Sequence, residues 1–116
     1  MSSNFDKIII ALDINTKEKA LQIVDQLKEK VKIFKIGMQL FTLLGPSIIE
    51  EIKKRGGEVF LDLKYHDIPN TVKSAAIEAA NYGVYIFTVH TLGGMEMLKQ
   101  TNEQLVNFCN EKKIRK

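Results

Sequence analysis

"FLDLKYHDIPNTV", residues 60–72, is the stretch on which the fold prediction depends. Within it, Asp62 and Lys64 alternate with Leu61 and Leu63. Successive side chains of a β-strand point to opposite faces, so the two charged residues share one face and the two leucines share the other. The proline that follows suits the first turn of a helix. The stretch therefore predicts a strand with a charged end, followed directly by a helix.

Three other apolar runs are also followed by amphipathic stretches with apolar residues at helical spacing. The four expected strands span residues 7–13, 32–37, 58–64 and 84–90. Strands that alternate with helices at this period pair in parallel through right-handed crossovers. The first run is almost entirely apolar, which is typical of a strand covered on both faces. We therefore expect four βα units.

Several helix boundaries are also marked in the sequence. Asn15, with Glu18 three residues later, matches a capping box at the start of the first helix. Gly45 and Pro46 interrupt the second helical stretch, and Pro46 suits the first turn of a new helix. The helix after the third strand is expected to begin near Pro69.

Length and element order leave two architectures open. A chain of 116 residues holds one domain with a modest core. Four βα units form either a small open doubly wound sheet or the N-terminal half of a TIM (β/α)8 barrel, a fold of about 250 residues. The fold class is α/β in both cases. Ligands of both architectures bind at the carboxyl ends of the strands.

Polar residues occur at the carboxyl end of every expected strand. They are Asp13, Lys35, Asp62, Lys64 and His90. A buried charge is costly unless an opposite charge lies beside it, so alternating acids and lysines compensate one another. A structural network of ion pairs and strand caps is one explanation. Because four strands converge charges on their functional ends, we favour a binding or catalytic site.

Composition excludes several classes of protein. Hydrophobic residues make up 45% and charged residues 27%, as in ordinary globular domains, and the net charge of +3 gives no support to nucleic-acid binding. No apolar run approaches the roughly 20 residues of a membrane span, so no membrane partner is expected. The single cysteine, Cys109, rules out an internal disulfide and fits a reducing compartment. A cytoplasmic location is expected. No group of histidine, cysteine or carboxylate residues has metal-ligand spacing.

The central stretch resembles the signature of a known enzyme family. It contains Asp-x-Lys-x-x-Asp followed by Ile-Pro-Asn-Thr, as in the orotidine 5'-monophosphate decarboxylases. The resemblance covers essentially the whole chain, including "IIALD", "KIGMQLF", "GPSIIEEIKKRGG" and "VHTLGGMEML". It implies decarboxylation of orotidine 5'-monophosphate to uridine 5'-monophosphate and CO₂ in pyrimidine synthesis. It also implies a (β/α)8 barrel, a homodimer with shared active sites, and no metal or organic cofactor.

The resemblance assigns roles to individual residues. The family's alternating charged tetrad corresponds to Lys35, Asp62, Lys64 and Asp67. Asp13 and Lys35 correspond to contacts with the ribose hydroxyls. Ile68 and Thr71 correspond to substrate-site residues that, like Asp67, reach across the dimer interface. The chemistry suits these residue types, since an ammonium group beside the reacting carbon stabilises a carbanion and delivers a proton.

The family's barrel has eight units, and this chain is expected to supply the N-terminal four over residues 1–116. The phosphate-binding loops are expected in the other half, so the chain alone is expected to be a truncated and inactive form. One alternative is a non-catalytic half-barrel that serves as an assembly module or is a truncation product. Another is a Mg²⁺-dependent decarboxylase or aldolase of sugar phosphates from the same suprafamily. These relatives share Asp-x-Lys-x-x-Asp but normally lack the Ile68–Thr71 motif.

Overall fold

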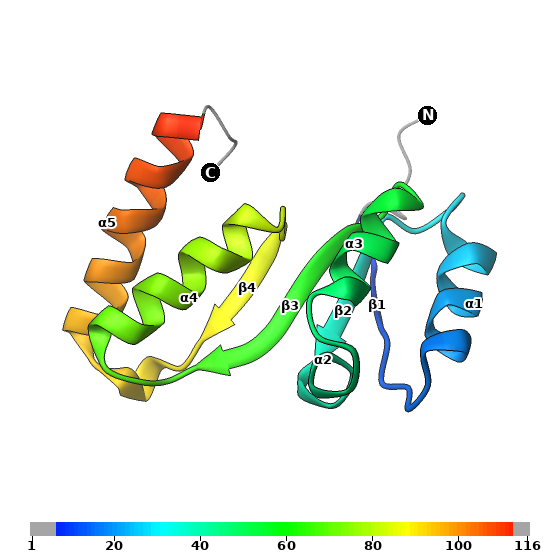
Figure 1. Ribbon diagram of the computed structural model, residues 1–116, viewed down its shortest axis with the longest axis horizontal. Helices are drawn as coiled ribbons and strands as arrows, with labels where there is room; N and C mark the ends of the chain where they lie inside the picture. Colours follow the sequence, from blue (N-terminus) through cyan, green and yellow to red (C-terminus); the bar gives the residue numbers. More distant parts are fainter. Residues whose placement is uncertain (1–6, 113–116) are drawn as a thin grey trace.

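Strands and helices alternate along the chain in the predicted order. A computed structural model describes residues 7–112. The elements are β1 (Ile9–Ala11), α1 (Lys17–Leu27), β2 (Ile33–Gly37), α2 (Met38–Leu44), α3 (Ser47–Lys54), β3 (Glu58–Tyr65), α4 (Pro69–Asn81), β4 (Ile86–Val89), the 3₁₀ turn η2 (Thr91–Gly93) and α5 (Met95–Lys112). In Figure 1 the strands run through the middle of the molecule, between α1 on one side and the α4–α5 pair on the other. The four expected βα units are confirmed.

All four strands belong to one parallel sheet with the order β1-β2-β3-β4. A doubly wound sheet reverses its strand order partway, whereas a (β/α)8 barrel adds each new strand beside the last. The observed order is therefore that of half a barrel. Gly37 lies beside Asp62 in the β2–β3 register. The carboxyl ends of these strands consequently meet at one edge of the sheet.

The hydrophobic core covers one face of this sheet. Phe34 and Ile36 of β2 and Val59 and Leu61 of β3 are buried there. They form one cluster with buried helix residues, including Ala20, Val24, Ile48, Ile49 and Ile52. At the β4 side, α5 packs against α4 (Figure 1). The alternation of β2 and β3 thus places these four apolar residues toward the helices. No helix within residues 7–112 is long and apolar enough to cross a membrane.

The opposite face of the sheet is open. Ile9 of β1 and Ile86 of β4 are 40% and 37% exposed, and the strand register places them on the same face as Ile33 and Phe60. The expectation that the first strand is covered on both faces is wrong. Helices cover the outer face only, and the inner face of a (β/α)8 barrel is filled by side chains from all eight strands. Four strands leave that face uncovered in the described part of the chain.

The helix boundaries differ from the sequence prediction at two points. Pro46, which was expected in the first turn of α3, is the cap residue before it. The cap of α1 is Thr16, whose side-chain oxygen accepts a hydrogen bond from the Lys19 amide at 3.2 Å. The expected capping box at Asn15 is therefore wrong by one residue. The interruption at Gly45 is confirmed, because this residue ends α2 with a φ of 65°, a conformation that favours glycine. Pro69 is the first residue of α4, as expected.

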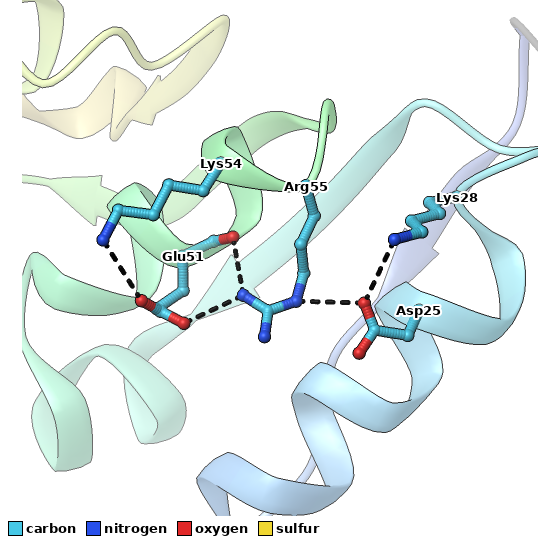
Figure 2. A network of polar contacts seen from close by, with 5 residues as sticks. All are labelled: Asp25, Lys28, Glu51, Lys54 and Arg55. Carbon is cyan, nitrogen blue, oxygen red and sulfur yellow. Dashed lines mark hydrogen bonds and ion pairs between the residues drawn. The ribbon is translucent and has the colours of Figure 1, made fainter.

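A polar network joins α1 to the end of α3 on the outer surface (Figure 2). The Arg55 guanidinium donates from Nε to Asp25 Oδ1 at 3.0 Å and from Nη1 to Glu51 Oε2 at 2.8 Å. Lys28 and Lys54 flank the two carboxylates. Arg55 lowers the pKa of the Glu51 carboxyl by hydrogen bonding to it. Exposed ion pairs each contribute little to the free energy of folding. We therefore expect this network mainly to orient α1 and α3 relative to one another.

Isoleucine-to-alanine substitutions on the two faces of the sheet should reduce the free energy of unfolding by very different amounts. Ile36→Ala removes a fully buried side chain from the core and is expected to reduce the free energy of unfolding by about 2–5 kcal/mol. Ile9→Ala makes the same chemical change on the open face and is expected to cost less than about 1.5 kcal/mol, because Ile9 is already partly hydrated. Urea denaturation measures both. An equal cost for the two variants would show that the inner face is covered.

Candidate active site

Three of the predicted site residues meet at the carboxyl ends of β2 and β3. The Lys64 ammonium donates to both oxygens of the Asp62 carboxylate, at 2.9 Å and 3.0 Å. The Lys35 ammonium lies 3.7 Å from Asp62 Oδ2. This contact is consistent with the prediction that Asp62 and Lys64 share one face of the strand. One carboxylate lies between two ammonium groups, and this arrangement offsets the cost of placing it on the sheet.

A fourth residue of this cluster, Thr88, was not identified from the sequence. Its hydroxyl donates to Asp62 Oδ1 at 2.8 Å and accepts a hydrogen bond from the backbone N–H of Lys64 at 2.9 Å. The signal that could have found it is the period-two alternation of "VYIFTVH", which places Thr88 on the same face as Ile86 and His90. Thr88 thus extends the cluster to β4.

The backbone at Lys64 is unusual. Its φ is 53°, and within residues 7–112 it is the one non-glycine residue with a positive φ. The pairing of β3 with β4 shifts register between Leu61 and Tyr65. A left-handed conformation costs a non-glycine residue about 1–3 kcal/mol and persists only where the surroundings impose it. The chain therefore holds Lys64 in a strained conformation at the point where it contacts Asp62.

The two charges of the Asp62–Lys64 pair differ in exposure. The Asp62 side chain is 14% exposed, whereas the Lys64 side chain is 61% exposed and faces the open side of the sheet. Hydrogen bonds from Lys64 and Thr88 hold the pKa of the Asp62 carboxyl below its usual value, and Lys35 acts in the same direction. Partial burial of Asp62 opposes this effect. Asp62 is consequently ionised at neutral pH and available to fix the Lys64 ammonium.

Three further predicted residues, Asp67, Ile68 and Thr71, lie on the loop after β3 and at the start of α4, where Asp67 and Thr71 line a shallow hollow together with Lys64. Asp67 accepts a hydrogen bond from the Ile68 amide at 2.7 Å, and in the described part of the chain it forms no ion pair with Lys35 or Lys64. Ile68 is 65% exposed, and Thr71 is exposed at the start of α4. Polar contacts thus join Lys35, Asp62 and Lys64, and among residues 7–112 they do not extend to Asp67.

Asp13 lies at the same edge of the sheet, beyond β1. Its carboxylate is near Gly37, where a Cβ atom added to the glycine would lie 3.8 Å from Asp13 Oδ1. Asp13 is exposed and therefore free to accept hydrogen bonds from a ligand. Its placement next to the end of β2 puts it on the same side of the molecule as Lys35.

The two histidines stack on one another beside the cluster. The rings of His66 and His90 lie 4.8 Å apart with an angle of 18° between their planes. Nδ1 of His90 accepts a hydrogen bond from the Leu92 amide at 3.2 Å. The stack therefore links the loop after β3 to the turn after β4. Across residues 7–112, no group of three or more histidine, cysteine or acidic residues is placed to hold a metal ion.

A separate hollow of about 580 Å³ lies at the other end of the strands. It is lined by the start of β3, the segment before β4 and one face of α5, including Leu105, Val106 and Cys109. Lys32 and Lys53 also line it, and Lys53 is paired with Glu58 at 3.5 Å and donates to the Gly83 carbonyl at 3.0 Å. Because none of the site residues predicted from the sequence lines this hollow, we place the candidate active site at the Asp62 cluster.

A family model and individual relatives that match this chain carry the same enzyme name. The model of the "Orotidine 5'-phosphate decarboxylase / HUMPS family" matches residues 6–113. The orotidine 5'-phosphate decarboxylase of Syntrophomonas wolfei is 50% identical over 102 residues, which cover 88% of this chain and 43% of that protein.

Solved structures agree with the sequence match. The orotidine 5'-phosphate decarboxylase of Lactobacillus acidophilus has a TM-score of 0.77 and 40% identity, covering 85% of this chain and 45% of that one. The orotidine 5'-monophosphate decarboxylase of Methanocaldococcus jannaschii, solved with the inhibitor BMP, has a TM-score of 0.79 and 33% identity. The match covers 88% of this chain and 48% of that one. This chain therefore spans less than half the length of these relatives.

The strain at Lys64 predicts an unusual order of stability for two substitutions. Lys64→Ala and Lys64→Gly remove the same ammonium group, but only glycine adopts a φ of 53° without a steric penalty. We expect the glycine variant to be more stable than the alanine variant by about 1 kcal/mol. Urea denaturation measures the difference. A more stable alanine variant would show that the backbone at this position is not strained.

The low pKa of Asp62 predicts a pH dependence of stability. Because the carboxyl is more acidic in the folded chain than in the unfolded chain, its contribution is present above about pH 4 and is lost as the pH falls through the folded value. Asp62→Asn should therefore lose less stability than the wild type between pH 6 and pH 2. Thermal unfolding across this range tests it, with the exposed Glu103→Gln as control. Parallel curves for wild type and Asp62→Asn would contradict the expectation.

Proposed function

The chain belongs to the orotidine 5'-phosphate decarboxylase / HUMPS family, and on that premise we propose that it carries the catalytic lysine of an orotidine 5'-phosphate decarboxylase. The substrate is orotidine 5'-monophosphate, and the products are uridine 5'-monophosphate and CO₂. The observation that carries the proposal is the Asp62 carboxylate held between Lys64 and Lys35 at the carboxyl ends of the strands. Relatives with 44–54% identity bear this enzyme name, which supports the substrate.

Lys64 performs the chemistry in this proposal. The bond between C6 of the pyrimidine and its carboxylate breaks, CO₂ leaves, and the electron pair remains on C6. This carbanion is poorly delocalised by the ring, so a fixed positive charge beside it lowers the barrier. The Lys64 ammonium supplies that charge and then transfers a proton to C6. The neutral amine afterwards regains a proton from water.

Asp62 prepares Lys64 for this role. Its two oxygens accept from the Lys64 ammonium at 2.9 Å and 3.0 Å, which fixes the direction of the side chain before substrate binds. A neighbouring carboxylate also favours the protonated form of a lysine when substrate excludes water. Lys35 balances the charge of Asp62 from the other side, at 3.7 Å. A preorganised array of this kind needs little rearrangement during the reaction.

The remaining predicted residues bind substrate or complete a second site. Asp13 and Lys35 contact the ribose hydroxyls. Asp67, Ile68 and Thr71 reach the active site of a partner subunit in a homodimer, which is supported by the exposure of all three residues and by the lack of an ion pair from Asp67 to Lys35 or Lys64 within residues 7–112. We also propose a cytoplasmic location, where pyrimidine nucleotides are made.

A decarboxylation assay tests this function. Because the relatives are more than twice as long as the matched region, the chain is assayed alone and together with the remaining half of the Syntrophomonas wolfei relative. We expect conversion of orotidine 5'-monophosphate by the mixture and little by the chain alone, since water at the open face weakens the field of the lysines. Failure of the mixture would contradict the proposal. A strict requirement for Mg²⁺, with turnover of sugar phosphates, would favour the alternative suprafamily activity.

Lys64→Ala should abolish turnover but preserve binding. Loss of a group that acts mainly in the transition state is expected to lower kcat by more than about 100-fold, while the affinity for uridine 5'-monophosphate changes little. Lys54→Ala is the matched control, because Lys54 is an exposed lysine of α3 in a different network. Product formation and calorimetric binding provide the two readouts. If Lys64→Ala retained about a tenth of the activity, Lys64 would not be the proton donor.

A further inference from the structure

We infer that Thr88 is a positioning residue that holds the Asp62 carboxylate and the Lys64 backbone in one fixed arrangement. Its hydroxyl is the point at which β4 contacts the charged cluster of β3, through hydrogen bonds of 2.8 Å to Asp62 Oδ1 and 2.9 Å from Lys64 N. The inference concerns the geometry of the cluster, and only its effect on catalysis rests on the function proposed above.

The two hydrogen bonds of Thr88 determine each other's direction. A hydroxyl carries one hydrogen and two lone pairs. The backbone N–H of Lys64 can only donate, and the ionised Asp62 carboxylate can only accept. The Thr88 hydrogen must therefore point to Asp62 while a lone pair accepts from Lys64. Replacement of the hydroxyl by a methyl group would remove the acceptor of the Lys64 N–H and, at the same time, one of the two donors to Asp62 Oδ1.

These contacts close a ring with the side chain of Lys64. The Lys64 N–H donates to Thr88, Thr88 donates to Asp62, and Asp62 accepts from the Lys64 ammonium at 2.9 Å. Hydrogen bonds in such a chain polarise and strengthen one another. The backbone and the side-chain end of Lys64 are thus both tied to the same carboxylate. Rotation of the ammonium away from its position would break the ring.

The local backbone explains why a side chain is needed here. The β3–β4 register shifts between Leu61 and Tyr65, so the ladder is interrupted beside Lys64. Lys64 also adopts its left-handed φ of 53° in this interval. The Thr88 hydroxyl provides an acceptor for the Lys64 amide within this gap. Because threonine is stiff about χ1 and Thr88 lies on a strand, the acceptor is held in place.

A purely structural role for Thr88 makes a different prediction. If the hydroxyl only satisfied an amide, its loss would reduce stability without changing the properties of Asp62. A positioning role also changes how Asp62 titrates, because Thr88 is one of the groups that lower the pKa of this carboxyl. The titration of Asp62 therefore separates the two roles.

The test compares Thr88→Val with Thr88→Ser in the 116-residue chain. Valine matches the shape of threonine but forms neither hydrogen bond, whereas serine retains the hydroxyl. Carboxyl-detected NMR should show a higher pKa for Asp62 in Thr88→Val than in wild type and a value close to wild type in Thr88→Ser. Thr101→Val is the matched control, since the Thr101 hydroxyl is buried on α5 without a hydrogen-bond partner among the described residues. If Thr88→Val does not fold, Thr88→Ala replaces it.

An unchanged Asp62 titration in Thr88→Val, or an equal shift in Thr88→Ser, would overturn the inference. In the reconstituted enzyme we expect Thr88→Val to lower kcat by about 10- to 100-fold with a smaller change in KM, and Thr88→Ser to restore most of it. A titration shift without any decarboxylation by the wild type would leave the positioning role intact and contradict the proposed function. Normal kcat in Thr88→Val despite a shifted titration would remove the catalytic part of the inference.

Discussion

Parallel pairing of β1 to β4 is the constraint on which both the core and the candidate site depend. It brings the carboxyl ends of the strands to one edge, so that side chains from three strands reach a single carboxylate, Asp62. The same pairing aligns the alternate residues of β2 and β3 on the outer face, where Phe34 and Leu61 are buried under the helices. The same strand pairing therefore places apolar side chains on the outer face of the sheet and polar side chains at the carboxyl ends of the strands.

Ion pairs between the charged side chains and the local backbone conformation together hold the charges at that edge in place. Asp62 is shielded and ionised, and it fixes an ammonium group that remains accessible from the open face. The conformation of Lys64 adds strain that the core and Thr88 must sustain. Such strain at a strand end is commonly associated with function, because it directs a side chain to a place that regular structure would not reach. In the function proposed above, this arrangement prepares the cluster for a ligand that develops a localised negative charge.

Sequence periodicity was sufficient to predict the alternation of elements, the break at Gly45 and the charged face of β3. These features depend on local spacing, which is directly visible in the chain. The cap at Thr16 was displaced by one residue, because Asn15 and Thr16 are both competent caps and the choice depends on tertiary packing. The alternation of β4 indicates the face on which Thr88 lies, but its contacts and the strain at Lys64 depend on a register shift between two strands, which no single segment encodes. The exposure of Ile9 likewise depends on what lies across the sheet.

The central claim is that the Asp62 cluster surrounds the reacting carbon of a pyrimidine nucleotide. The most direct measurement is a crystal structure of the reconstituted enzyme with uridine 5'-monophosphate bound. The account predicts that Lys64 Nζ lies within about 3.5 Å of C6 of the base, with the ribose hydroxyls near Asp13 and Lys35. A nucleotide bound in the hollow beside α5, or with C6 turned away from Lys64, would contradict it.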